Sequence, residues 1–357
     1  MKQICNLLFV LMIAVPVFAE ESDYKNLQCF EEMSKPELQR TMSFIRASLG
    51  VHCDFCHVVT KETGWQWNND DKASKITARR MIRMVMEINK SHFDEKPVVS
   101  CFTCHQGHIR PNGLPPLPQA TPIYPTTVPD KGIVAYPAQQ ILNKYFQAIG
   151  GDSRKPIEKA ATWILTGIST ANWAKKEEAV EVQFKAPDRW RIRIKGEKEE
   201  TIQILSGDKG WVQDAAESRA MTPKEITFFR ELLFSIQLQP APATLKEAMV
   251  RKTKIGEHES FELEYPLQER TTRHLYFSAN TGLLLRSSRA TQSPIGIIPD
   301  QVDYEDYRDV NGSKIPTVLI SNYVDPWMSG TWKFTEIQQD VPIDDSMFRM
   351  PDIMKDK

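Results

Sequence analysis

The sequence lacks an excess of charge of either sign. Its 357 residues include 45 lysines and arginines and 46 aspartates and glutamates, so the formal net charge is −1. A balanced charge gives the chain no general attraction to nucleic acid or to an anionic membrane surface. We therefore expect no nucleic-acid partner.

Long hydrophobic runs are also scarce. Residues 4–17 are mostly apolar, but this run is too short, and too interrupted by Pro16, to indicate a membrane span. It follows the positively charged Met1-Lys2 and ends at Val17-Phe18-Ala19, a small-residue cleavage pattern. We therefore predict that residues 1–19 are a secretory signal peptide and that the mature protein is exported to the periplasm. An uncleaved segment that holds the protein at the membrane is the alternative.

Cysteine is rare, with six residues in the chain, and its positions are specific. Cys5 lies in the predicted signal peptide, and four of the other five form two copies of Cys-x-x-Cys-His, at 53–57 and 101–105. This is the attachment motif of c-type haem, in which the cysteines form thioethers and the histidine binds the iron. The predicted attachment residues are Cys53, Cys56, Cys101 and Cys104, and the predicted iron ligands are His57 and His105.

Zinc and disulfides are the alternatives for these cysteines. Two Cys-x-x-Cys pairs that share a zinc ion are usually separated by about 12–20 residues, whereas 44 residues separate Cys56 from Cys101. Neither zinc nor a disulfide explains why a histidine follows each pair. We therefore predict two covalently bound c-type haems. The remaining Cys29 is expected to be a buried free thiol, with pairing between molecules as the alternative.

A helix that carries a methionine is predicted before the first motif. Ser34 can cap its start, with Glu37 three residues later, and Gly50 can end it. Its apolar face is predicted to contain Leu38, Met42, Ile45 and Leu49. Met42 lies 11 residues before Cys53, or about three turns, so its thioether could reach the iron opposite His57. Packing in the core is the alternative for Met42.

A second helix is predicted from Asp70 to about Asn89, before the second motif. Its expected apolar face consists of Thr77, Met81, Met84, Val85 and Ile88. Met81, Met84 and Met86 are all candidates for the second distal ligand. Met86 would lie on a different face, and helical periodicity does not choose between Met81 and Met84. Between the two helices, residues 58–69 are expected to form a loop in which Trp65 and Trp67 cover a haem edge or the core.

This region resembles the cytochrome c subunit of photosynthetic reaction centres. The matching positions are Met42-Ser43-Phe44, Leu49-Gly50-Val51 with the first motif, Ile82-Arg83-Met84-Val85, Ile88-Asn89, and the second motif with Thr103, Gly107 and Pro111. The resemblance implies that Met42 and Met84 are the distal iron ligands, with Met81 as the fallback. It also implies electron transfer, since that subunit re-reduces the oxidised primary donor.

The chain departs from that family in two respects. A typical member carries four haem motifs and this chain has two, and the C-terminal half is unrelated. Electron transfer therefore carries over well from the resemblance, whereas docking to a photosynthetic reaction centre carries over poorly. The expected partner is a redox protein: a membrane-bound reaction centre, a respiratory complex or another exported redox protein.

Proline marks the end of the predicted haem domain. Eight prolines fall between Pro111 and Pro137, a composition typical of an extended linker. A helix is then predicted at 138–149, and another from Thr222 to about Phe234. Short alternating strands dominate the rest, at 179–184, 190–194, 201–205, 261–265, 274–277, 283–289, 302–307, 317–322 and 331–337.

The strand pattern resembles the lipoprotein-carrier fold of outer-membrane lipoprotein-sorting proteins. The resemblance lies in strand order, in Gly207-Asp208-Lys209-Gly210-Trp211 and in the segment from Tyr304 to Pro316. The resemblance implies a curved antiparallel sheet, and it makes a bound lipid a possible partner of the C-terminal domain. The expected fold is multidomain: an α-helical multihaem cytochrome c domain at 20–112, a linker at 113–137, and an antiparallel β half-barrel domain with a few helices (α+β) at 138–357.

Electron transfer is the function that this pattern favours. Histidine and methionine together fill both axial positions of an iron, which leaves no open site for a substrate and favours a carrier over an enzyme. A di-haem peroxidase-like enzyme and a lipid or quinone carrier with a haem tether are the alternatives. No ligand role is assigned to His52, His92 or His108, and His258 and His274 are expected to be structural or exposed.

Overall fold

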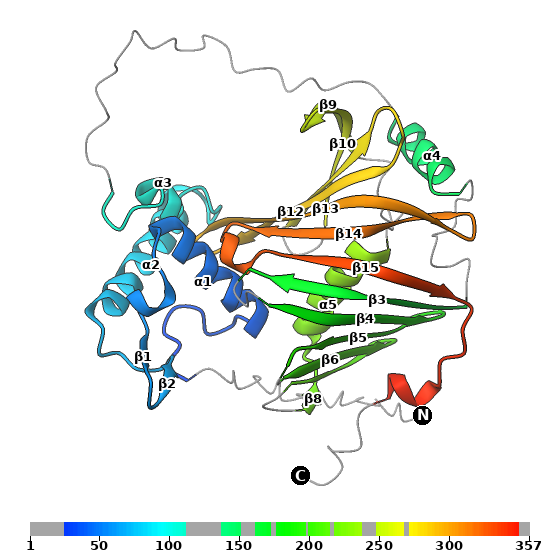
Figure 1. Cartoon of the computed structure of the whole chain (residues 1–357). Helices are drawn as coiled ribbons and strands as arrows, with labels where there is room; N and C mark the ends of the chain where they lie inside the picture. The colour runs from blue at the N-terminus through cyan, green and yellow to red at the C-terminus, as the bar shows by residue number, and fades with distance from the viewer. Residues whose placement is uncertain are drawn as a thin grey trace, which may run out of the picture.

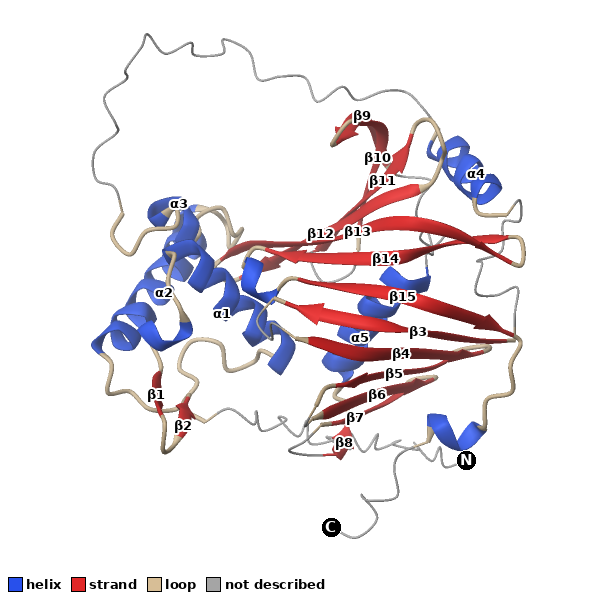
Figure 2. Cartoon of the chain, viewed as in Figure 1, coloured by secondary structure: helices blue, strands red, loops and turns tan. Residues whose placement is uncertain are grey.

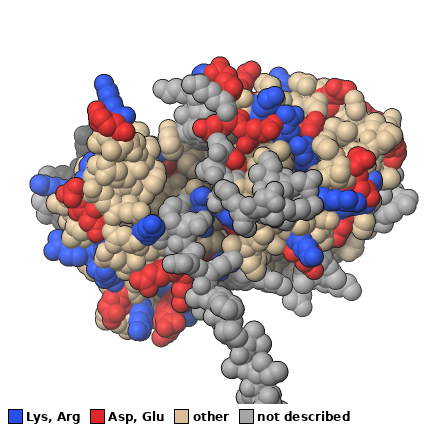
Figure 3. All heavy atoms as spheres, turned by 90° about the horizontal axis from the view of Figure 1, so that it is seen from below, with Lys and Arg blue, Asp and Glu red and all other residues tan. Residues whose placement is uncertain are grey.

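The computed structural model describes residues 25–111, 137–150, 161–172, 176–197, 199–214, 218–237, 248–267 and 271–349. The predicted signal peptide and nearly all of the predicted linker lie outside these residues. A small helical part adjoins a large antiparallel sheet (Figures 1 and 2). Among the described residues, no helix combines the length and the apolar character needed to cross a bilayer. On the face seen in Figure 3, basic and acidic side chains are both spread over the surface.

The helical part begins with helix α1 (Lys35–Leu49). Ser34 and Glu37 form the predicted capping box, Pro36 lies in the first turn, and Gly50 ends the helix at a φ of 65°. These features confirm the predicted start and end of the helix. The remaining elements are η1 (Cys53–Phe55), β1 (Val58–Thr60), β2 (Gly64–Gln66), α2 (Ala73–His92) and α3 (Cys101–His105). The short β1–β2 hairpin replaces the loop that was expected before α2.

Helix α2 buries only part of the predicted face: Val85 is buried as expected, but most of the buried face is different. Its buried residues are Lys75, Arg79, Ile82, Val85 and Asn89, whereas Thr77, Met81 and Met84 are exposed. Lys75 and Arg79 can be buried on this face of α2 because the Asp70 carboxylate pairs with both. Its oxygens lie 3.0 Å from Lys75 Nζ and 2.7 Å from Arg79 Nη1. A paired charge is far less costly to bury than an unpaired one. The two methionines therefore face outward.

The sheet has thirteen antiparallel strands among the described residues. They are β3 (Thr162–Ala171), β4 (Glu177–Lys185), β5 (Arg189–Lys195), β6 (Glu200–Ser206), β7 (Lys209–Gln213), β8 (Ser218–Ala220), β9 (Met249–Ile255), β10 (His258–Pro266), β11 (Thr271–Ser278), β12 (Leu284–Ser293), β13 (Gly296–Val310), β14 (Ser313–Tyr323) and β15 (Gly330–Gln339). The expected strands are all present.

Chain order explains how the sheet is assembled. Strands β3 to β8 follow one another to one edge, and β9 to β15 return from the other edge until β15 pairs with β3. The order runs from β8 to β9, which are the two edges, so the described sheet is open and not closed as a barrel. The prediction of a large antiparallel sheet with few helices is confirmed.

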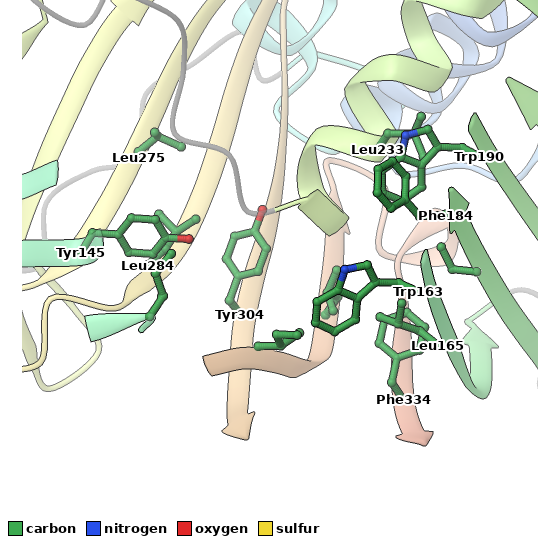
Figure 4. Close-up of a cluster of buried hydrophobic side chains, with 14 of the residues drawn as sticks. Tyr145, Trp163, Leu165, Phe184, Trp190, Leu233, Leu275, Leu284, Tyr304 and Phe334 are labelled. Carbon is green, nitrogen blue, oxygen red and sulfur yellow. The ribbon is translucent and has the colours of Figure 1, made fainter. Parts of the chain in front are cut away.

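Helices α4 (Ala138–Ala148) and α5 (Pro223–Gln237) complete the core of the sheet, near their predicted positions. Tyr145 of α4 is fully buried, and its ring lies 5.3 Å from that of Phe277. Leu233 of α5 is 1% exposed and lies beside Phe184 and Trp190, as Figure 4 shows. Burial of these large side chains is the main force that holds the helices to the sheet.

The helical part and the sheet share a hydrophobic cluster. Ile295, in the turn between β12 and β13, is fully buried in the cluster that contains Phe30, Phe44 and Cys101 of the helical part. Gly296 lies so close that a Cβ there would fall 2.6 Å from the Cβ of Ser100. This contact joins two parts of the chain that were predicted to be separate domains, and no pattern in the sequence indicates it.

Candidate haem-attachment site

The first motif is folded as a single helical turn. The backbone N–H groups of Cys56 and His57 both donate to the carbonyl oxygen of Cys53, at 3.2 and 2.9 Å. This turn places the two cysteines and the histidine of the motif within one short segment. The His57 ring lies 5.0 Å from the ring of Trp67, which in turn stacks on Trp65. Both tryptophans remain exposed, so they form an aromatic surface beside the motif.

The second motif is helix α3 itself. Ser100 caps it and accepts a hydrogen bond from the backbone N–H of Thr103. Nδ1 of His105 lies 2.9 Å from the carbonyl oxygen of His108. Because a carbonyl only accepts, Nδ1 is the donor in this contact, which leaves Nε2 as the nitrogen that can bind a metal. The supporting role of the His108 backbone was not predicted, since sequence patterns carry no signal for a backbone acceptor.

Burial keeps the groups of the first motif neutral. It lowers the pKa of His57, to which the positive charge of Lys75 also contributes, so the imidazole is in the form that binds iron. Nδ1 of His57 is buried without a hydrogen-bond partner among the described residues. Burial also raises the thiol pKa of Cys53 and Cys56. In the second motif, burial raises the pKa of Cys101 to about 11.

The cysteines described in the structure are all free. Cys29 was predicted to be a buried free thiol; it is free, but it is only half-buried. Cys53 and Cys56 are half-buried, Cys101 is buried and Cys104 is exposed. Both motifs therefore present two free thiols and one histidine with an available nitrogen, which is the donor set that c-type haem requires.

The two motifs lie next to each other. The backbone N–H of Gly107, just after the second motif, donates to the carbonyl oxygen of Ser48 at 2.9 Å. Gly50, just before the first motif, contacts the backbone of Gly107. Figure 1 shows α3 against the end of α1. The two Cys-x-x-Cys-His motifs, which are about fifty residues apart in sequence, are therefore neighbours in the fold.

The helical part exposes many large hydrophobic side chains. Of the twelve large hydrophobic side chains that are exposed in the described residues, nine belong to the helical part. They are Val59, Trp65, Trp67, Ile76, Met81, Met84, Val98, Phe102 and Ile109. Soluble proteins rarely leave so much apolar surface in one region unless something covers it. Large, flat and mostly apolar haem groups fit this surface.

The structure places the candidate distal ligands in two environments. Met42 is half-buried and packs against the cluster around Phe44. Met81 and Met84 lie on the exposed face of α2, at 37% and 44% exposure, whereas Met86 packs inward. The structure thus separates Met86 from the other two, as predicted, and leaves both Met81 and Met84 accessible to an exposed haem.

His274, which was expected to be structural or exposed, lies beside a carboxylate. Its Nδ1 lies 2.8 Å from Glu262 Oε1 on the neighbouring strand, and Arg251 pairs with the adjacent Glu264. The hydrogen bond from His274 is the main cause that lowers the pKa of Glu262. This is a compensated network of charges on the sheet, so it supports the structural interpretation of His274.

Residues 17–120 match the family model of the photosynthetic reaction centre cytochrome c subunit. The chain is 33% identical over 93 residues to the photosynthetic reaction center cytochrome c subunit of Thermochromatium tepidum. The matched region is 25% of this chain and 22% of that protein. The chain is also 30% identical over 95 residues to cytochrome c-554 of Chloroflexus aurantiacus, covering 25% and 21%. The helical part is therefore similar in sequence to these cytochrome c subunits. The chain spans about a fifth of the length of these relatives.

Solved structures resemble the sheet. A LolA-superfamily protein of Nitrosomonas europaea covers 60% of this chain, with a TM-score of 0.40 and 14% identity over 98% of its own length. A DUF1329-family protein of Desulfovibrio piger also covers 60%, with a TM-score of 0.44 and 12% identity over 97% of its length. A lipoprotein-sorting protein domain of Vibrio parahaemolyticus gives a TM-score of 0.39 and 8% identity, covering 59% and 94%.

Proposed function

We propose that this chain is an exported c-type cytochrome that binds two haems and transfers electrons. The observation that carries the proposal is the pair of Cys-x-x-Cys-His turns that meet where Gly50 contacts Gly107. Each turn offers two free thiols and one histidine nitrogen, and the surface beside them is apolar. When bound, haem supplies reversible one-electron exchange between ferrous and ferric iron.

The chain's own residues have distinct parts in this proposal. Cys53 and Cys56, and likewise Cys101 and Cys104, fix the two haems by thioether bonds. His57 and His105 provide the imidazole nitrogens on the proximal side, and the His108 carbonyl orients His105. Met42 and Met84 are proposed on the distal side, with Met81 as the fallback. With both axial positions filled, a carrier is favoured over a peroxidase-like enzyme.

The partner is proposed to be another redox protein, such as a membrane-bound reaction centre or a respiratory complex. The cytochrome c similarity supports electron transfer, and only a fifth of the relatives' length is matched. The predicted signal peptide supports an exported, periplasmic location.

Spectra of the purified protein test the proposal. A carrier with two His/Met haems should show the weak long-wavelength sulfur-to-iron band in the ferric state, and the ferrous protein should not bind carbon monoxide. A high-spin ferric spectrum with rapid carbon monoxide binding would instead support the enzyme alternative.

A further inference from the structure

A turn of the sheet brings a buried charge to the end of α1 that leads to the first Cys-x-x-Cys-His motif. Asp325 caps the short helix η4 (Pro326–Met328), between β14 and β15, and accepts a hydrogen bond from the backbone N–H of Trp327 at 3.0 Å. Its carboxylate pairs with Arg46 of α1, whose guanidinium lies 5.2 Å from the centroid of the Trp327 ring. The side chains of Asp325 and Arg46 are 5% and 14% exposed, so water and salt screen both charges only weakly.

Arg46 adjoins two parts of the proposed first haem site. It follows Met42 by four residues on α1, and residues at this spacing are neighbours on one face of a helix. Its Nη2 also lies 3.0 Å from Nδ1 of His52, which accepts the hydrogen bond because a guanidinium only donates. His52 directly precedes Cys53, the first attachment cysteine. Arg46 and its partner Asp325 are therefore held beside the proposed distal ligand and the attachment segment of the same haem.

Both charges act on the first motif. Burial is the largest cause of the raised pKa of Cys53, and after burial the positive charge of Arg46 lowers this pKa while the negative charge of Asp325 raises it. In the second motif, burial and the neighbouring Cys104 raise the pKa of Cys101. The pair of Arg46 and Asp325 therefore gives the first motif an electrostatic environment that differs from that of the second.

We propose that Asp325 lowers the reduction potential of the first haem by opposing the positive charge of Arg46, so that a residue of the C-terminal domain sets the potential of one of the two haems. This inference rests on the proposed function, because it requires a haem on Cys53 and Cys56. One-electron reduction makes the haem site more negative by one unit. A positive charge nearby therefore favours the ferrous state, and a negative charge favours the ferric state.

A redox titration of the purified two-haem protein at low salt tests the proposal. Asp325→Asn leaves the charge of Arg46 unopposed, so it should shift the ferrous-to-ferric ratio of one haem about tenfold, which raises its potential by about 59 mV, and leave the other haem unchanged. Arg46→Gln should lower the same potential by a similar amount, and the double variant should restore the wild-type value. A chain in which Cys101 and Cys104 are both serine identifies the titration step that belongs to the first haem.

Asp300→Asn is the matched control for a loosened contact between α1 and the sheet. Asp300 is half-buried and also pairs with α1, through Arg40 at 2.6 Å. Arg40 is two residues from Met42, a spacing that places the two side chains on different faces of the helix. This variant should leave both potentials unchanged, and thermal unfolding shows that each variant is folded.

A second pair of variants keeps the test decisive if Asp325→Asn does not fold. Trp327 is 42% exposed, so Trp327→Glu and Trp327→Gln place a charged and a neutral side chain of similar shape on η4 without removing the buried pair. The glutamate variant should have the lower first-haem potential of the two.

Three results would overturn the proposal. They are equal potentials in the two Trp327 variants, shifts of the same sign in Asp325→Asn and Arg46→Gln, and a shift in Asp300→Asn as large as that in Asp325→Asn. A first motif that carries no haem, which the intact mass shows separately, would instead overturn the proposed function.

Discussion

Gly50 and Gly107 are in direct backbone contact. A Cβ built on Gly50 would lie 2.2 Å from the carbonyl oxygen of Gly107, and Gly50 has a φ of 65°. Gly50 lies three residues before Cys53, and Gly107 lies two residues after His105. The contact therefore sets the relative position of the two predicted haem sites, and it requires glycine at residue 50 for two independent reasons.

Replacing Gly50 by alanine should destabilise the protein both through the positive φ and through the contact with Gly107. Positive φ alone costs an alanine about 1–2 kcal/mol, and the clash with Gly107 adds to it, so we expect Gly50→Ala to lower the free energy of unfolding by about 3 kcal/mol. Urea denaturation measures this. Gly64→Ala is the matched control, because Gly64 has a φ of 63° but no atom within 4 Å of a built Cβ. Equal losses in the two variants would show that the Gly50–Gly107 contact is unimportant.

Methionine replacements on α2 should identify the second distal ligand. Met84→Leu should lower the reduction potential of one haem and allow its ferrous iron to bind carbon monoxide, because thioether sulfur favours ferrous iron. Met81→Leu should leave both properties unchanged, although Met81 is similarly exposed. Met86→Leu, at an inward-facing position, is the control for packing. If Met81→Leu allows the ferrous iron to bind carbon monoxide and Met84→Leu does not, Met81 is the second distal ligand.

The contact between Arg46 and Asp325 should hold the two parts of the chain together. Asp325 is 4% exposed and pairs with Arg46 of α1, whose guanidinium lies 5.2 Å from the ring centroid of Trp327. Asp325→Asn leaves a buried cation without its charge partner, so we expect a loss of about 3 kcal/mol in the free energy of unfolding. Glu259→Gln, which breaks an exposed pair with Lys254, should cost under about 1 kcal/mol. Similar small losses in both variants would contradict this role.

Asp70 should make the stability of the protein sensitive to acid. Hydrogen bonds from Arg79 and then Asn26 hold the pKa of Asp70 well below its usual range. A carboxyl group with a lowered pKa in the folded state contributes stability above its unfolded pKa, about 4, and loses that contribution as the pH falls below it.

Urea titrations between pH 7 and pH 2 check this. Asp70→Asn should be less stable than wild type at pH 7, and the gap should shrink below about pH 4 as wild type loses the same interaction. A gap that stays constant with pH would show that the carboxylate charge of Asp70 contributes nothing.

Local signals were enough to predict most of the elements. Ser34, Glu37 and Gly50 predicted both ends of α1 because capping depends on neighbouring residues alone. The alternating strands were equally visible, since each strand has one face toward the core. The haem motifs are also local, and the segment that contains them is similar to cytochrome c subunits.

Features that depend on distant partners were missed. Most of the buried face of α2 was predicted wrongly because Lys75 and Arg79 are polar in sequence, and only their pairing with Asp70 lets them be buried. The burial of Ile295 in the helical cluster depends on how two separate segments dock. The same holds for the Gly50–Gly107 contact, for which spacing in the sequence gives no signal.

The covalent haem count tests the central claim most directly. The full chain should be produced in a host that exports and matures c-type cytochromes, and its intact mass should be measured after denaturation. We predict two covalently bound haems, which should fall to one when Cys101 and Cys104 are both replaced by serine. A protein that carries one haem or none after competent maturation would contradict the account.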